Sequence, residues 1–417
     1  MSTKLPPSFS GVYEEPAAVT GSLNDLLRQK LNAIQLKEPP NANRADNLLS
    51  CALDTVEHIL HAPFDKACLD QKLETLFECQ QTVYHHANIP AELRKRQFIG
   101  RHGLVMSPDY CITTVKDSLR VRAFLRAIDH GIANLRKRVS GSLNIVYPAC
   151  GPFAPLLIPL IGYYKQKELY SEQDVQITLI DSQPGAIASL HALIDALQIR
   201  SFIRDIQLLD GCEYQTTEPV HMVVLEAMQH GFSREGHLAL ARHFANMIEP
   251  DGCFIPNEIR LTAVISEGQQ EYIEQWRGKS GKVFEANMSP ESLKHRVVLG
   301  DILNLTPDSL RQLKEQKIDQ FTSLIECGTV PLPDLPDTIK QPLLLICTRV
   351  ITGEYEGSQE VIGEYDSGIT HPLPDMQMCI NFIPKESKPG DLLVNSGDRL
   401  KFYYRLNGLP GFMPVKI

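Results

Sequence analysis

Two glutamates stand nine residues apart in the stretch VVLEAMQHGFSREGHLALARHF, which begins at Val223. Glu226 closes a short apolar run, so we expect it at the end of a buried strand. The loop that follows contains Gly231, which permits a bend, and it is long enough to return Glu235 to the side of Glu226. Two facing carboxylates repel each other unless they share a cation, and a planar guanidinium with several N–H donors satisfies both. The spacing therefore predicts a site for a guanidino group.

Further acids follow two other apolar runs. ITLIDS contains Asp181, and IQLLDGCEY contains Asp210 and Glu213. In a doubly wound sheet, ligands bind at the carboxyl ends of the strands, where an acid can accept hydrogen bonds from a ribose or an adenine amino group. Asp181 fits a ribose contact and the cap of the following helix about equally. Asp210 and Glu213 fit an adenine edge or two solvated loop acids, and the residues alone leave both interpretations open.

Two more segments belong to this candidate site. The loop IVYPACGPFAPLLIPL contains Gly151 as its sole glycine, at a strand-to-helix turn where a glycine-rich loop normally lets a cofactor approach the backbone. In VKDSLRVR, Lys116, Asp117 and Arg120 share about one helical turn, and Arg120 can pair with the carboxylate of an amino-acid moiety. An exposed Asp–Arg pair on a helix is the simpler interpretation of the same residues.

The elements that must position these residues fall into three parts. Helical spacing of apolar residues predicts a helical region over 1–105, with one helix starting near Ser22 and others over Leu48–Leu60 and Leu69–Tyr84. Over 106–258, short apolar runs alternate with helical stretches, which predicts a parallel sheet with crossover helices. Over 259–417, apolar runs joined by NSGD and NGLPG turns predict antiparallel strands, interrupted by a polar helical segment.

Composition limits the class of protein. The 417 residues are 43% hydrophobic and 22% charged, which is typical of a globular protein with a sizeable core. The net charge of -9 argues against a nucleic-acid partner and suits a cationic substrate. No apolar run approaches the roughly 18 residues that span a bilayer, and the first residues lack the apolar region of a signal peptide. The ten cysteines are scattered singly, without metal-like spacing, so we expect a cytoplasmic protein with no metal site and no membrane partner.

The segment around the two glutamates resembles the protein arginine methyltransferases, a branch of the class I S-adenosylmethionine-dependent methyltransferases. The most specific match is LEAMQHGFSRE followed by ARHFANMIEPDGCFIPNEIRL, where Met228, Gly252 and Pro256 fall in compatible places. KDSLR resembles the family's helix whose arginine holds the cofactor carboxylate. SGITHPLP, with His371, resembles the start of the family's Thr-His-Trp loop. The similarity runs over Ser107–Ile417 with its order preserved.

The sequence departs from the family pattern mainly in the first loop. Tyr147 replaces the usual acid, and Ala149 and Phe153 stand where glycines are expected, so only Gly151 matches there. In the Thr-His-Trp loop, Pro372 occupies the place of the tryptophan. The first-loop departures bear directly on affinity for the cofactor.

The resemblance implies an α/β fold: a Rossmann-like seven-stranded methyltransferase core, a helical N-terminal region and a β-barrel-like C-terminal domain for substrate binding and dimerisation. It implies S-adenosyl-L-methionine as cofactor, held by Arg120, Ala149, Gly151, Asp181, Ser182, Asp210, Cys212 and Glu213. Glu226 and Glu235 would clamp the guanidino group of a protein or a small molecule. His371 would accept a proton or tie two domains together, and we favour the second role. Family members commonly form dimers through a helical arm, for which Thr306–Leu324 is a candidate, although it fits a surface insertion equally well.

Two other functions stay open. The same fold can methylate a small-molecule amine, such as free arginine, in natural-product biosynthesis. A methyltransferase-like chain without catalysis can serve as an interaction or dimerisation module, which the glycine-poor loop favours and the intact pair of glutamates disfavours. We expect an active transferase.

Overall fold

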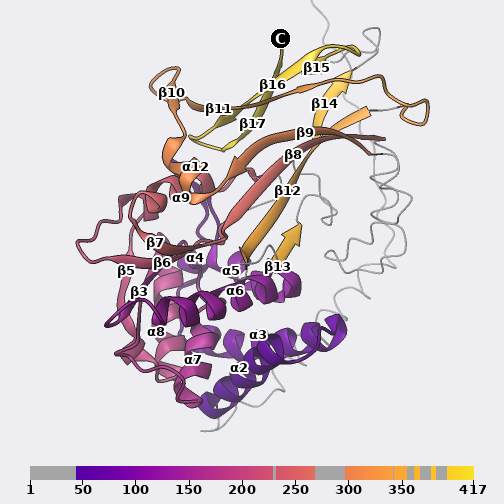
Figure 1. Ribbon diagram of the computed structural model, residues 1–417. Coiled ribbons are helices and arrows are strands. Elements are labelled where there is room, and N and C mark those ends of the chain that lie inside the picture. Colours follow the sequence, from indigo (N-terminus) through magenta and orange to yellow (C-terminus); the bar gives the residue numbers. More distant parts are fainter. Residues whose placement is uncertain are drawn as a thin grey trace, which may run out of the picture. The chain divides into compact units, whose positions relative to one another are not determined.

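The computed structural model describes residues 44–228, 232–267, 296–340, 342–354, 361–366, 377–381 and 392–417. The chain divides into two units, Met1–Arg44 and Ala45–Ile417, and the second contains the sheets and the candidate site (Figure 1). The predicted helix near Ser22 and the predicted site residue His371 lie outside the described residues. The division into three parts at residues 105 and 258 stays a prediction. Within the described ranges, every helix is too short or too polar to cross a membrane.

A parallel sheet of five strands forms the centre of this unit. Its order is β5-β4-β3-β6-β7. The chain therefore adds β4 and β5 on one side of β3 and then crosses back to add β6 and β7 on the other side. The strands are β3 (Leu143–Pro148), β4 (Val175–Asp181), β5 (Ile203–Leu208), β6 (Val220–Val224) and β7 (Ile248–Ile255). Every residue of β3 is buried, as expected for the middle of a covered parallel sheet. The predicted α/β class with a parallel sheet is confirmed, whereas a seven-stranded core stays a prediction.

Helices precede and connect these strands. The first two, α2 (Arg44–His61) and α3 (Lys66–His86), run side by side and confirm the helices predicted from apolar spacing (Figure 1). The other described helices are α4 (Ala91–Arg94), α5 (Pro108–Cys111), α6 (Ser118–Arg136), α7 (Ile158–Gln166), α8 (Pro184–Ala196), α9 (His237–Ala245) and α12 (Pro307–Gln312), with the 3-10 turns η1 (Ile112–Lys116), η2 (Arg200–Phe202) and η3 (Gly211–Glu213).

The seam between α2 and α3 brings two cysteines together. The Sγ atoms of Cys51 and Cys79 lie 2.7 Å apart. On the same seam, Lys72 Nζ lies 2.5 Å from Asp54 Oδ2, and Thr55 Oγ1 donates to the Lys72 carbonyl at 3.4 Å. The earlier residue of α2, Cys51, contacts the later residue of α3, Cys79, whereas the later residues of α2 contact Lys72, near the start of α3. The two helices are therefore antiparallel. The two cysteines are 28 residues apart in the sequence, so only the packing of the helices brings this pair together.

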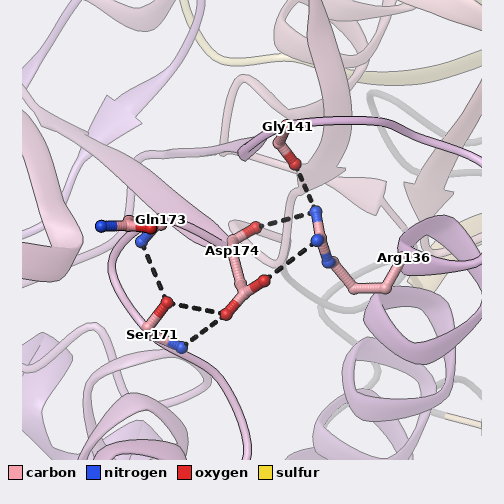
Figure 2. Close-up of polar contacts among 5 residues, drawn as sticks. All are labelled: Arg136, Gly141, Ser171, Gln173 and Asp174. Carbon is pink, nitrogen blue, oxygen red and sulfur yellow. Dashed lines mark hydrogen bonds and ion pairs between the residues drawn. The ribbon is translucent and has the colours of Figure 1, made fainter.

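A polar junction holds the amino ends of β3 and β4 (Figure 2). Arg136 Nη2 donates to Asp174 Oδ1 at 2.9 Å, and Arg136 Nη1 donates to the Gly141 carbonyl. Asp174 Oδ2 accepts from the Ser171 backbone N–H at 2.9 Å and from Ser171 Oγ at 2.7 Å. These hydrogen bonds from Ser171, helped by the Arg136 charge, hold the pKa of the Asp174 carboxyl below its usual value. The junction lies at the opposite strand ends from the candidate site, so it positions strands rather than binding a ligand.

The chain after β7 forms two mainly antiparallel sheets, as predicted for residues 259–417. One has the order β15-β14-β12-β8-β9, with β13 also paired to β12, and the other has the order β10-β11-β16-β17. Their strands are β8 (Glu258–Glu267), β9 (Val297–Leu305), β10 (Glu315–Lys317), β11 (Ser323–Pro331), β12 (Pro342–Glu354), β13 (Val361–Asp366), β14 (Gln377–Asn381), β15 (Leu392–Leu393), β16 (Arg399–Arg405) and β17 (Gly411–Lys416). Thr352 on β12 is buried and donates to the Ala123 carbonyl of α6 at 2.9 Å, which joins this sheet to the helices around the parallel sheet. A closed barrel stays a prediction.

The segment Thr306–Leu324 differs from the predicted helical arm. Its helix α12 begins with the Thr306 cap and ends at Gln312, after which the chain becomes extended and forms β10. It packs on α9 of the same chain, where Arg311 Nε donates to the Ala245 carbonyl at 2.7 Å. A long helix is wrong here because Leu313 is already extended and Glu315–Lys317, which are polar and exposed, pair with β11 instead.

Candidate active site

A pocket with a volume of about 280 Å³ lies where the parallel strands end. Residues that follow β3, β4, β5 and β6 all contribute to its walls. This is the location expected for a ligand in a doubly wound sheet, because the loops at the carboxyl ends diverge there. Its size is near the lower end of the roughly 300–1,000 Å³ typical of small-molecule sites.

The pocket brings most of the predicted site residues together. Its lining includes Arg120, Ala149, Gly151, Asp181, Ser182, Asp210, Glu226 and Glu235. Cys212 and Glu213 belong to the adjoining turn η3 but are outside the lining, and Glu213 is exposed. The prediction that both hold an adenine edge stays a prediction, because neither residue lines the pocket.

Arg120 and Glu226 form an ion pair inside the pocket. Arg120 Nη1 donates to Glu226 Oε1, and the two side chains are only 12% and 13% exposed. Arg120 Nε lies 3.3 Å from Asp117 Oδ2, and the Asp117 side chain also caps α6. Burial raises the pKa of the Glu226 carboxyl, and the Arg120 guanidinium opposes that rise. The interpretation of Asp117 and Arg120 as an exposed helix pair is therefore wrong, because Arg120 turns inward to compensate a buried acid.

His237 connects the two ends of the loop that carries the glutamates. Its Nδ1 donates to the Ala227 carbonyl at 3.2 Å, one residue after Glu226, while His237 itself lies two residues after Glu235. His237 is 2% exposed, and this burial lowers the pKa of its imidazole to about 3. At neutral pH the imidazole is uncharged and carries one N–H proton. This proton lies on Nδ1, where it is donated to the Ala227 carbonyl. His237 was not among the predicted site residues, because nothing in the sequence distinguishes it from other helix-start histidines.

The C-terminal sheet supports the same loop. Tyr404 Oη donates to the Phe232 carbonyl at 2.7 Å, and the Arg234 N–H donates to the Pro410 carbonyl at 2.9 Å. Phe232 and Arg234 have φ values of 59° and 64°, in the left-handed region that costs most side chains energy. The loop therefore holds an unfavourable backbone conformation that depends on these tertiary contacts.

A small hairpin forms another wall of the pocket. Its strands are β1 (Phe98–Ile99) and β2 (Leu104–Val105), and Leu104 N donates to the Arg234 carbonyl at 2.7 Å. A Cβ on Gly236 would lie 2.8 Å from the His102 carbonyl oxygen, so the two backbones meet where no side chain fits. Strands of two residues carry no alternating pattern, which is why this wall was not predicted.

The glycine-poor loop after β3 adopts the backbone conformation of a glycine loop. Ala149 has φ 49° and Gly151 has φ 67°. Phe153, at a position where glycine was expected, turns its ring into the core, with ring centroids 6.3 Å from Phe77 and 5.8 Å from Tyr84. A Cβ on Gly151 would meet no atom closer than 3.9 Å, so the backbone there faces open space. The substitutions in this loop thus leave room for a ligand.

Asp181 joins this loop to the end of β4. Its Oδ2 accepts from the Gly151 N–H at 2.9 Å and its Oδ1 accepts from the Gln183 N–H at 2.8 Å. Burial raises the pKa of Asp181 to about 6 in spite of these hydrogen bonds. Each carboxylate oxygen has a further lone pair, so Asp181 can hold the loop and still accept a hydrogen bond from a ligand hydroxyl.

The lining carries an excess of negative charge. Its ionisable groups other than thiols and phenols are four carboxylates, one guanidinium and one imidazole: Asp181, Asp210, Glu226, Glu235, Arg120 and His102. Such a set of charges favours a cationic ligand and disfavours an anionic one. His102, Asp210 and Cys212 also lie close enough together to hold a metal ion.

Comparisons with known proteins give matches only among solved structures. No protein-family model matches the sequence, and no curated protein matches it. The chain is similar to the Trypanosoma brucei PRMT1 enzyme-prozyme heterotetrameric complex with AdoHcy, at 13% identity and a TM-score of 0.41, over 74% of this chain and 98% of that chain. It is also similar to Arabidopsis thaliana protein arginine methyltransferase 10, at 10% identity and a TM-score of 0.39, over 68% of this chain and 84% of that chain.

Proposed function

We propose that this chain is an S-adenosylmethionine-dependent N-methyltransferase that acts on a guanidino group. The observation that carries the proposal is an acidic pocket at the carboxyl ends of parallel strands, with Glu226 and Glu235 both in its lining. The reaction brings together two cations, a sulfonium and a guanidinium. An excess of carboxylates reduces the repulsion between them. The sequence resemblance to arginine methyltransferases supports the same activity.

The residues present fit the cofactor. When bound, S-adenosylmethionine supplies a sulfonium methyl group that a guanidino nitrogen displaces directly. The open backbone at Gly151 would accept the approach of the cofactor, Asp181 would accept hydrogen bonds from its ribose, and Asp210 would face its adenine. Arg120 would pair with its carboxylate. Cys212 and Glu213, which are outside the lining, have no assigned role in this proposal.

Arg120 links cofactor binding to acceptor binding. Its guanidinium contacts Asp117 and Glu226, which supports the proposal that the Glu226 carboxylate holds a guanidinium. If Arg120 donates some of its N–H groups to a cofactor carboxylate, Glu226 loses part of its ion pair. A buried carboxylate without a cationic partner is costly, so Glu226 then requires another cation. The acceptor guanidinium then becomes the natural partner of Glu226.

The two glutamates would activate the acceptor by binding it. Charge-assisted hydrogen bonds from the guanidinium to Glu226 and Glu235 would hold the positive charge on the nitrogens that donate them, which leaves the remaining nitrogen more nucleophilic. The same bonds would fix its direction of attack, and positioning of this kind provides much of the acceleration in a direct displacement. The nitrogen that gains the methyl group releases one proton. Glu226 is suited to accept it because burial raises the pKa of its carboxyl.

The test compares Glu226→Gln and Glu235→Gln with the wild type, and mass spectrometry follows the methylation of free arginine and of an arginine-containing peptide. We expect either substitution to lower the rate by about 100-fold or more, the usual scale for loss of a group that stabilises charge in a transition state. Cofactor affinity should change little in Glu235→Gln. Glu249→Gln, an exposed site with the same change of charge, is the control. Full activity of Glu226→Gln would show that the clamp is wrong.

A further inference from the structure

We propose that His102, Asp210 and Cys212 form a binding site for a divalent transition metal ion, with Zn²⁺ as the best match. One ligand atom from each residue lies within 4.8 Å of the other two. His102 comes from the turn of the β1–β2 hairpin, whereas Asp210 and Cys212 come from the segment that enters η3 after β5. The three residues are therefore brought together by the fold and not by a short sequence motif.

The donor set matches zinc chemistry. Imidazole nitrogen, carboxylate oxygen and thiolate sulfur are the donors that Zn²⁺ takes from proteins. Three protein ligands leave a fourth position for water or another small ligand, as in zinc sites with an open coordination position. Magnesium and calcium prefer oxygen ligands alone, so the sulfur and nitrogen here argue against both.

The separation between the His102 and Asp210 ligand atoms already suits coordination. His102 Nδ1 lies 3.5 Å from Asp210 Oδ2. Zinc–ligand bonds of about 2.0–2.3 Å in a tetrahedron place neighbouring ligand atoms roughly 3.3–3.7 Å apart. A metal ion can therefore bind between these two groups with little movement. Nδ1 is buried, and its contact with Asp210 Oδ2 is at the length limit of a hydrogen bond, so an ion would give this atom a stronger partner.

The surroundings orient the carboxylate and admit an ion. Asp210 Oδ1 accepts from the Cys212 N–H at 2.9 Å, which fixes the carboxylate and leaves Oδ2 on the side of His102. Hydrogen bonds of this kind to a metal ligand improve affinity by restricting its orientation. The His102 and Asp210 side chains are 23% and 38% exposed, so solvent reaches the cluster.

A bound ion would crosslink two walls of the pocket. His102 and Asp210 both belong to the lining. The hairpin is otherwise held by backbone bonds such as Leu104 N to the Arg234 carbonyl at 2.7 Å and Gly408 N to the Arg101 carbonyl at 3.0 Å. Metal coordination between the hairpin and η3 would add a further attachment beside the ligand. The metal thereby holds the β1–β2 hairpin in place, independently of the identity of the ligand in the pocket.

The experiment titrates the full chain, reduced and free of cofactor, with Co²⁺, which occupies zinc sites and reports a thiolate ligand through ultraviolet charge transfer. We expect one equivalent of Co²⁺ with a thiolate band, displaced by one equivalent of Zn²⁺. Cys212→Ser should abolish the band, and His102→Gln should weaken binding by at least about tenfold. His191→Gln on α8 and Cys68→Ser on α3, outside the cluster, should bind as the wild type does.

Absence of a thiolate band in the wild type would overturn the site. So would a band that persists with unchanged affinity in Cys212→Ser, because the ion would then be held by other cysteines. Since the titration uses the metal alone, its outcome is independent of methyl transfer.

Discussion

Replacement of His237 by asparagine is expected to change how the free energy of unfolding depends on pH. His237 is 2% exposed, and burial lowers its pKa to about 3 from a usual value of about 6.5. Between these values the unfolded chain binds a proton at this residue and the folded chain does not. The folded state is therefore fully stable with respect to His237 above about pH 6.5 and loses stability as the pH falls toward 3. At about 1.4 kcal/mol per pH unit, the change from pH 7 to pH 5 lowers the free energy of unfolding by about 2 kcal/mol.

Asp181 changes the free energy of unfolding with pH in the opposite direction from His237. Burial raises its pKa to about 6, so the folded chain takes up this proton more readily than the unfolded chain. The folded state gains stability from Asp181 as the pH falls below about 6, and this gain amounts to about 1 kcal/mol between pH 7 and pH 5. The pH dependence of unfolding in the wild type alone therefore does not give the contribution of His237. The difference between the wild type and His237→Asn does, because Asp181 is present in both.

The assay is urea unfolding at pH 7 and pH 5, followed by circular dichroism. The wild type should lose about 2 kcal/mol more than His237→Asn between the two pH values. His191→Gln removes an exposed histidine from α8 and should follow the wild type. Equal losses in the wild type and His237→Asn would refute the neutral buried imidazole and, with it, the bond that joins the two ends of the glutamate loop.

Three further substitutions test the contacts that position the loop and the pocket. Tyr404→Phe removes the 2.7 Å hydrogen bond to the Phe232 carbonyl and should lower the free energy of unfolding in urea by about 1 kcal/mol. An unchanged free energy would mean that this hydrogen bond does not hold the loop. Gly236→Ala places a methyl group 2.8 Å from the His102 carbonyl oxygen and should cost about 1–3 kcal/mol, so an unchanged stability would contradict the close approach of the hairpin. Ala149→Gly relieves a φ of 49° and should leave the melting temperature unchanged or higher, whereas a fall would argue against that conformation.

Much of the parallel sheet could be predicted because burial leaves a simple pattern. Strands such as β3 and β4 are buried almost throughout and therefore appear as continuous apolar runs. The rule that ligands bind at the carboxyl ends of such strands was enough to select Asp181, Asp210 and Glu226, which line one pocket. The amphipathic helices α2, α3 and α6 followed from apolar spacing in the same way.

The contacts that finish the site could not be predicted, because each joins residues far apart in the chain or depends on an exact backbone path. Arg120 reaches Glu226 only after α6 packs beside β6, and His102 reaches Asp210 only through a hairpin of two-residue strands. The bond from His237 to Ala227 depends on a return of the chain that no residue type specifies.

Calorimetric titration of the full chain with S-adenosylmethionine tests the central claim most directly. The proposed function predicts saturable binding to one site with a micromolar dissociation constant. It also predicts weaker binding to Asp181→Asn, which keeps the side-chain size but exchanges an acceptor oxygen for an amide donor. No detectable binding to the wild type would contradict the claim, because the pocket would then not be a cofactor site.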